Sequence, residues 1–188
     1  MNIKFGTDGW RAVIAEDFTF ANVARVAQAT ADYWSANPVA GTVKKIIVGY
    51  DRRFLSDDFA RCTAEVLAGN GFAVLLTPEP TPTPSVSFAV KQLHAVGGVM
   101  ITASHNPPSD NAVKVYWSTG GQIVPPQDRG IVERVMAVTE IKQVDFQTAV
   151  AEGKVVLCKE EIDSAFIENV VSQHCPGPRD LRILYSPL

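Results

Sequence analysis

The segment GGVMITASHNPPSDNAVKVYW, residues 97–117, joins an apolar run to a loop of polar residues and prolines. The run AVGGVMIT predicts a strand that is buried on both faces, because half-exposed strands alternate apolar and polar residues. After the prolines, AVKVYW alternates in that way, and we expect it to pair at the edge of the sheet. The segment therefore predicts a strand, a stiff loop and a second strand.

Similar apolar runs lie upstream and alternate with amphipathic stretches. KKIIVGYD and FAVLLT predict two further strands. The spacing of apolar residues predicts helices in five ranges, the first with Thr19 as its N-cap: 19–34, 57–71, 85–93, 125–139 and 159–174. Strands that alternate with helices favour a three-layer α/β/α sandwich around a mostly parallel mixed sheet.

The predicted topology places three loops at one edge of this sheet. Ligands of such sheets bind beyond the carboxyl ends of the strands. The loops that follow the predicted strands there are YDRR at residues 50–53, TPEPTPTP at residues 77–84 and TASHNPP at residues 102–108. We expect a functional site where these loops meet.

Composition narrows the function classes. The chain has 17 basic and 20 acidic residues, a net charge of -3 and no basic tract, so nucleic acid is a poor candidate partner. Cys62, Cys158 and Cys175 form no C-x-x-C pair, which favours reduced thiols. The N-terminus lacks the apolar core of a signal peptide, and no apolar run is long enough to span a bilayer. We therefore expect a cytoplasmic protein that binds neither nucleic acid nor membranes.

Ser104 lies where the buried strand passes into the loop, and its role has several interpretations. A serine in such a place is often only a turn former or a helix cap. A serine hydrolase is disfavoured, because there is no G-x-S-x-G elbow and the ring of His105 in an extended loop should point away from the hydroxyl. The remaining candidate bases would be His94 and His174. Without the elbow, and without His105 beside the hydroxyl, acyl transfer is a poor candidate.

Phosphoryl transfer through the oxygen of Ser104 is the other chemical interpretation. A seryl phosphate carries about two negative charges near neutral pH and needs cationic neighbours or a metal ion. Lys114 and Arg11 could supply positive charge, although each could equally be an ordinary surface residue. We expect the prolines after Asn106 to stiffen the loop and to hold the serine hydroxyl outward.

The N-terminal segment GTDGWRA could bring its backbone close to a phosphate. Gly6 and Gly9 flank Thr7 and Asp8, and glycine permits close approach, although a plain turn explains the pair as well. The sequence contains neither G-x-x-x-x-G-K-[ST] nor G-x-G-x-x-G, so it supports neither a P-loop nor a dinucleotide site.

Together these segments resemble the α-D-phosphohexomutases, which include phosphoglucomutase, phosphomannomutase and phosphoglucosamine mutase. The resemblance covers nearly the whole chain, in the family's order. Four segments carry it. The N-terminal loop of the family is similar to KFGTDGWRA, and its G-x-D-x-R segment (Gly49, Asp51, Arg53) is similar to VGYDRR. The connecting loop with its helix is similar to PTPTPSVSFAV, and the phosphoserine loop is similar to TASHNPPSDNAVKVY.

The resemblance implies roles for four residues. Ser104 would hold the transferable phosphate, and Arg11 and Lys114 would lie near it, with Lys114 as a candidate general acid or base. His105 would have a supporting role. In the family, Mg2+ is bound by the seryl phosphate of the residue that matches Ser104 and by aspartates of a D-G-D-x-D-R loop that this sequence lacks. Many members have glycine where this chain has Ala112, which would be strained if that position required a positive φ.

The resemblance also implies a domain organisation. Residues 1–175 would form the first of four domains, and residues 176–188 would be a linker and the first strand of a truncated second domain. The sugar-binding loops of the family lie in the third and fourth domains. We therefore expect this chain to fold alone but to be essentially inactive without domains 2 to 4.

The implied function is interconversion of hexose 1-phosphate and 6-phosphate, with glucose or mannose as the sugar. The route would be a phosphoserine enzyme and a hexose 1,6-bisphosphate intermediate, which would also act as an activator. Two alternatives stay open, a phosphoglucosamine mutase and a non-catalytic module that binds phosphosugars.

Overall fold

A seven-stranded mixed sheet runs through the computed structural model, which describes residue 3, residues 5–6 and residues 9–186. Its order is β1-β2-β6-β5-β3-β4-β7. β5, β3, β4 and β7 run parallel, whereas β6, β2 and β1 are each antiparallel to their neighbours. The strands are β1 Phe5–Gly6, β2 Gly9–Val13, β3 Val43–Tyr50, β4 Ala73–Leu76, β5 Ala95–Ile101, β6 Asp110–Trp117 and β7 Val155–Leu157.

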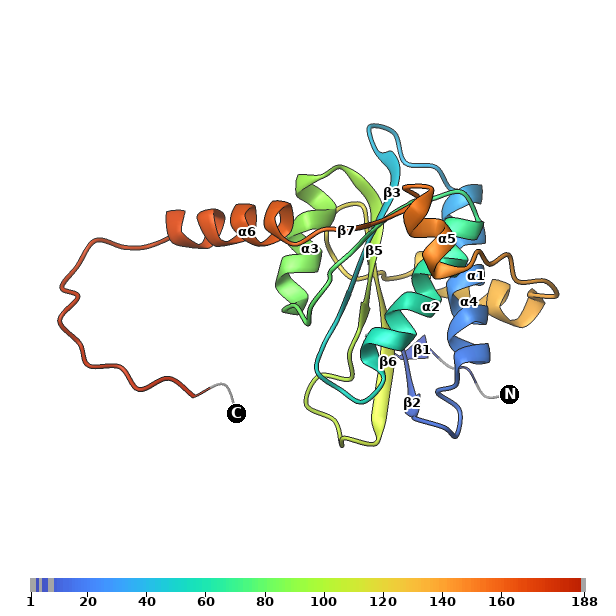
Figure 1. Ribbon diagram of the computed structural model, residues 1–188, viewed down its shortest axis with the longest axis horizontal. Coiled ribbons are helices and arrows are strands. Elements are labelled where there is room, and N and C mark those ends of the chain that lie inside the picture. Colours follow the sequence, from blue (N-terminus) through green and yellow to red (C-terminus); the bar gives the residue numbers. More distant parts are fainter. Residues whose placement is uncertain (1–2, 4, 7–8, 187–188) are drawn as a thin grey trace.

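Helices cover both faces of the sheet, which confirms the predicted α/β/α sandwich (Figure 1). α1 and α2 pack on one face, where α4 lies against α1 and α5 against α2, and α3 and α6 pack on the other. The helices are α1 Phe20–Ala36, α2 Ser56–Gly69, α3 Thr83–Gln92, α4 Gln127–Ala137, α5 Phe146–Ala151 and α6 Glu160–Ser172.

The side chains of β3 show why its sequence is apolar without alternation. Ile46 and Val48 are fully buried in the core beneath α1 and α2. Ile47 between them is fully buried in the opposite core, beneath α3. Successive side chains of a strand point to opposite faces, so the part of β3 that is covered on both sides is apolar without alternation, whereas Lys44 and Lys45 at its start are not buried.

Specific polar contacts fix the helices at their ends. The side chain of Thr19 accepts a hydrogen bond from the amide of Asn22, 3.3 Å away, and so caps α1 as predicted. The C-cap of α2 is Asn70, whose side-chain amide exchanges two hydrogen bonds of 2.9 and 2.8 Å with Gln28 of α1. Gly71 then turns the chain with a φ of 75°. These contacts lock α1 and α2 together at the end of the sheet where β4 begins.

The prediction that residues 112–117 pair at the sheet edge is wrong. β6 lies inside the sheet, between β5 and β2, and Arg11 of β2 pairs with Ala112. The segment GTDGWRA, residues 6–12, is predicted to be a loop because Gly6 and Gly9 flank Thr7 and Asp8, whereas Gly9–Val13 form β2. The short elements α5 and β7 were also missed, because segments of six and three residues show no measurable periodicity.

The C-terminal part of the described chain leaves the body of the molecule. α6 projects beyond the sheet, and the segment after it runs on without secondary structure (Figure 1). Residues 181–186 pair with no strand in the described part of the chain, so the proposal that they begin a second domain stays a prediction. None of the helices in residues 3, 5–6 and 9–186 is both long and apolar enough to cross a membrane.

Substitution of Gly97 tests the packing of α1 on β5. A Cβ atom at Gly97 would touch the indole ring of Trp34 and would lie 2.5 Å from the carbonyl oxygen of Tyr116. We expect Gly97→Ala to lower the free energy of unfolding in urea by about 2 kcal/mol, because the core would be overpacked. In Gly121→Ala the nearest atom is Thr119 Oγ1 at 3.5 Å, so this control should stay within about 0.5 kcal/mol. Equal effects of the two substitutions would contradict this packing.

Candidate active site

Ser104 forms the corner of the loop that joins β5 to β6. Its side chain is exposed, as predicted, and its backbone has a φ of 56°, in the left-handed region. A residue other than glycine keeps this conformation only where its surroundings fix it. Asn106 contributes to this fixation, because its amide and its side chain both donate to the carbonyl of Ala103, at 3.0 and 2.6 Å. The serine hydroxyl is therefore presented to solvent from a rigid corner.

His105 lies beside the serine hydroxyl. The Nδ1 atom of His105 is 3.4 Å from Ser104 Oγ, and both residues are exposed. The expectation that the imidazole points away is wrong, because the left-handed backbone of Ser104 breaks the alternation of an extended chain. Within the described residues no side chain hydrogen-bonds the Nε2 atom of His105, so the orienting third member of a hydrolase triad is not found there.

The carboxylate of Asp51 connects the loop to the sheet. Its Oδ2 atom accepts a hydrogen bond of 2.5 Å from Thr102 Oγ1, and Oδ1 accepts from Ser56 Oγ at 2.9 Å and from the amide of Arg53 at 3.0 Å. Thr102 Oγ1 in turn accepts the amide of Ser104 at 3.0 Å. The end of β3, the start of α2 and the end of β5 are thus joined through one charged group.

Asn111 extends this network into the interior. It is fully buried, donates to Ser56 Oγ at 2.9 Å and accepts the amide of Ala112 at 2.9 Å. Buried polar groups need such partners because water cannot reach them. Ala112 lies in β6 and is not among the residues with positive φ, so the strain considered for alanine at this position does not arise.

Arg11 and Lys114 lie together on the face of the sheet that α3 covers. Arg11 pairs with Ala112, and paired residues of antiparallel strands point to the same face, as does Lys114 two residues farther along β6. Met100, which pairs with Lys114, belongs to the core beneath α3. Arg11 is exposed and Lys114 is half-buried. The structure therefore brings these two cations together, next to the strand end from which the Ser104 loop emerges.

The N-terminal glycines have a packing role in the structure. Gly9 has a φ of 105°, and a Cβ atom there would collide with the carbonyl oxygen of Val113 in β6. Glycine at this position lets β2 lie against β6, and Gly6 pairs with Gly9 across β1 and β2. Thr7 and Asp8 lie outside the described residues, so the predicted approach of this loop to a phosphate stays a prediction.

The described residues do not form a metal site by themselves. Among them, no three His, Cys, Asp or Glu side chains are close enough together to hold a metal ion. Both carboxylate oxygens of Asp51 already accept hydrogen bonds from within the network. Any Mg2+ ion at Ser104 would therefore need ligands that this part of the chain does not supply, and the Mg2+ prediction stays open.

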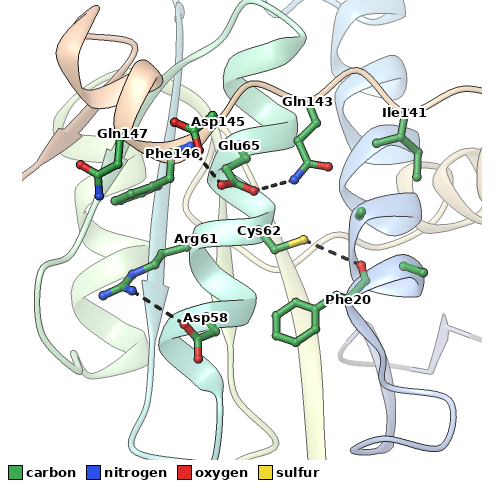
Figure 2. Close-up of a pocket in the computed structure, with 12 residues that line it drawn as sticks. Phe20, Asp58, Arg61, Cys62, Glu65, Ile141, Gln143, Asp145, Phe146 and Gln147 are labelled. Carbon is green, nitrogen blue, oxygen red and sulfur yellow. Dashed lines mark hydrogen bonds and ion pairs between the residues drawn. The ribbon is translucent and has the colours of Figure 1, made fainter.

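A surface recess of about 680 Å³ lies elsewhere, between α1, α2 and α5 (Figure 2). Its floor includes Cys62, whose Sγ atom faces the carbonyl of Phe20 at 3.8 Å. Burial raises the pKa of the Cys62 thiol to about 12, so the thiol is protonated near neutral pH and is a poor nucleophile. At the rim, Arg61 pairs with Asp58 at 3.7 Å. Ser104 does not line this recess.

Sequence reasoning did not single out Asn111, and it gave Asp51 and Arg53 no role of their own. The signal for Asp51 was present, because an acidic residue that directly follows a buried parallel strand faces the ligand edge of the sheet. Asn111 gave no such signal, since a polar residue in an alternating strand is normally exposed.

Comparison with known proteins identifies the fold. The family described as phosphoglucomutase/phosphomannomutase, alpha/beta/alpha domain I, matches residues 2–142. A phosphoribomutase from Saccharomyces cerevisiae is 41% identical over 184 residues, and a phosphoglucomutase from Staphylococcus saprophyticus is 33% identical over 176 residues. These matches cover 89% and 90% of this chain but only 29% and 31% of the two relatives.

A solved structure has the same fold. The phosphoglucomutase/phosphomannomutase family protein from Burkholderia thailandensis superposes with a TM-score of 0.71, with 20% identity, over 90% of this chain and 35% of that one. The α/β/α sandwich is thus the fold of a phosphoglucomutase/phosphomannomutase domain. The chain belongs to the phosphoglucomutase/phosphomannomutase family and contains its domain I. It spans less than a third of the length of the two curated relatives.

Removal of the buried amide of Asn111 tests the inner network. Asn111→Ala would leave Ser56 Oγ without a donor and the amide of Ala112 without an acceptor, both inside the protein. We expect the free energy of unfolding to fall by about 2 to 3 kcal/mol, measured by urea titration. Asn169→Ala removes an exposed asparagine of α6 and should change stability by less than about 0.5 kcal/mol. A loss at Asn111 as small as that at Asn169 would contradict the network.

The three thiols should react at very different rates. Burial raises the pKa of Cys62 from 9.0 to about 12 and that of Cys158 from 9.0 to about 11, whereas Cys175 is exposed. At pH 8 we expect iodoacetamide to modify Cys175 first and Cys62 far more slowly, because Cys62 is buried and its raised pKa makes its thiolate rare. Intact mass against time measures this. Three adducts at equal rates in the folded protein would contradict it.

The same pKa shifts make stability depend on pH. A thiol whose pKa is raised on folding favours the folded state fully below its unfolded pKa, and this preference is lost as pH rises from about 9 towards 12. Cys62→Ala should weaken that decline in urea titrations at high pH. A decline unchanged by Cys62→Ala would show that other groups cause it.

Proposed function

We propose that Ser104 carries a phosphoryl group that the protein exchanges with sugar phosphates. The protein would then interconvert hexose 1-phosphate and hexose 6-phosphate, with glucose or mannose as the sugar, through a hexose 1,6-bisphosphate. The observation that carries this proposal is the exposed hydroxyl of Ser104 at a corner that hydrogen bonds hold in a left-handed conformation. Membership of the phosphoglucomutase/phosphomannomutase family supports it.

Each transfer is a displacement at phosphorus. The sugar hydroxyl forms a new P–O bond, the bond between phosphorus and Ser104 Oγ breaks, and the hydroxyl proton passes to a base while the serine oxygen is protonated. Lys114 and His105 are the candidate acid–base groups. The Nδ1 atom of His105 lies 3.4 Å from Ser104 Oγ. The bisphosphate then reorients, and the reverse displacement returns its other phosphate to the serine.

Positive charge is the second requirement of this chemistry. A seryl phosphate and a sugar phosphate together carry about four negative charges near neutral pH. Arg11 and Lys114 share one face of the sheet beside the loop, where they could bind the phosphate oxygens. Mg2+, if it binds the phosphate on Ser104, would supply further positive charge.

The identity of the sugar has a second candidate. The phosphoribomutase relative is 41% identical to this chain, and the phosphoglucomutase relative is 33% identical. The phosphoribomutase among the relatives makes ribose phosphates alternative candidate substrates of the whole protein. A phosphoglucosamine mutase and a non-catalytic phosphosugar-binding module remain the other candidates, and the binding module has no need of an exposed nucleophilic hydroxyl.

Intact mass of the whole natural protein, purified from cells, tests the proposal. We expect an adduct of about 80 Da that maps to Ser104 and disappears when a hexose monophosphate is added. Ser104→Ala should lack the adduct, whereas Ser109→Ala, which removes an exposed hydroxyl from the same loop, should keep it. An unmodified wild type, even after incubation with glucose 1,6-bisphosphate and Mg2+, would favour the binding module.

Discharge of the adduct also identifies the sugar. Glucose, mannose, glucosamine and ribose phosphates are added separately to the phosphorylated protein, and the rate of loss of the adduct ranks them. Residues 1–188 expressed alone should fold but show no turnover, because the chain spans less than a third of the two relatives. Ordinary turnover by this piece would contradict that expectation.

A further inference from the structure

The guanidinium group of Arg53 is bound by the Ser104 loop. Its Nη1 atom donates to the carbonyl oxygens of Pro107 at 2.7 Å and Asp110 at 2.9 Å, and its Nη2 atom donates to those of Ser104 at 2.8 Å and Asn106 at 2.6 Å. An arginine has two N–H bonds on each of these nitrogens. All four are therefore directed at the backbone of one loop.

The other end of the Arg53 side chain lies beside Asp51, the residue that follows β3. Its Nε atom lies 3.5 Å from Asp51 Oδ2, and its own amide donates to Asp51 Oδ1 at 3.0 Å. The Arg53 side chain is only 12% exposed. Asp51 also accepts the hydroxyl of Thr102, which accepts the amide of Ser104. The serine backbone is thus fixed on both sides, at its amide through Thr102 and at its carbonyl through Arg53.

We propose that Arg53 is the positioning residue of the phosphoryl carrier. It holds the loop so that Ser104 Oγ occupies the same place when it gives and when it accepts the phosphate. The inference rests on the function proposed for Ser104. Arg53 acts through the backbone of the loop, because its four terminal donors are all engaged with carbonyl oxygens.

The geometry of the contact requires an arginine. Four carbonyl oxygens converge on one planar group, and their negative ends would repel one another without a cation between them. A lysine has the same charge, but it has three donors on a single nitrogen and cannot match a planar fork. Arg53→Lys therefore keeps the charge near Ser104 and removes the fixed geometry, whereas Arg53→Gln removes both.

Arg52 provides a matched control. It is the preceding residue in the sequence, has the same side chain and is exposed. Arg52→Lys makes the same chemical change beside the same loop while leaving the carbonyl contacts of Arg53 in place.

The first measurement is hydrogen exchange in the whole natural protein, which does not depend on activity. We expect peptides that cover residues 102–110 to exchange at least about tenfold faster in Arg53→Lys, because charge-assisted hydrogen bonds to the loop are lost. Peptides from α1 should exchange as in wild type, which shows that the variant is folded. Wild-type exchange in the loop of Arg53→Lys would overturn the inference.

The second measurement is steady-state turnover with the sugar phosphate that discharges the adduct fastest. A misplaced nucleophile should lower kcat about 100-fold in Arg53→Lys and leave KM nearly unchanged. Arg53→Gln should fall at least as far, and Arg52→Lys should match wild type. Normal kcat in Arg53→Lys together with a loss in Arg53→Gln would show that only charge matters, which overturns the positioning role.

The two proposals can fail separately. If wild-type Ser104 never accepts phosphate, the proposed function is wrong, whereas hydrogen exchange still reports whether Arg53 holds the loop. If Ser104 is phosphorylated and Arg53→Lys behaves as wild type in both measurements, the function stands and the role of Arg53 is wrong.

Discussion

The site depends above all on the carboxylate of Asp51, which accepts hydrogen bonds from the loops after β3 and β5 and from the first residue of α2. It follows β3 directly, and its amide donates to the carbonyl of Ile101 at the end of β5 at 3.1 Å. The register of the parallel strands β3 and β5 therefore sets the position of the carboxylate. The carboxylate in turn positions Thr102 and the serine corner. The Asp51 side chain is 25% exposed, and three hydrogen bonds from the chain itself stabilise its charge there.

The change from parallel to antiparallel pairing has a chemical consequence. β5 is parallel to β3, so the loops after both strands meet at one edge. β6 then runs back beside β5, and β2 runs forward beside β6, which brings Arg11 and Lys114 to one face near the same edge. Cations from distant parts of the sequence thus approach a serine that belongs to a third segment.

The sequence predicted those features that depend on local patterns. Apolar runs located β3, β4 and β5, Thr19 marked the start of α1, and the three loops at the carboxyl edge were expected. It did not predict that His105 turns towards Ser104, because the left-handed backbone of Ser104 depends on loop contacts that include Arg53, about fifty positions away in the sequence. β6 was misplaced for the same reason, since its second neighbour is a five-residue strand at the other end of the chain.

The projecting helix α6 is locally less stable than the sheet. Ile162 near its start is buried against α3, and Phe166 stacks edge-on with Phe88 at 5.8 Å, but Ile167, Val170 and Val171 are each more than half exposed. An isolated helix of this length is only marginally stable in water. The last turns of α6 should therefore fray on their own, as a separate cooperative unit, while the sheet and its serine corner remain intact. Motion at this end of the chain need not disturb the edge of the sheet that carries Ser104.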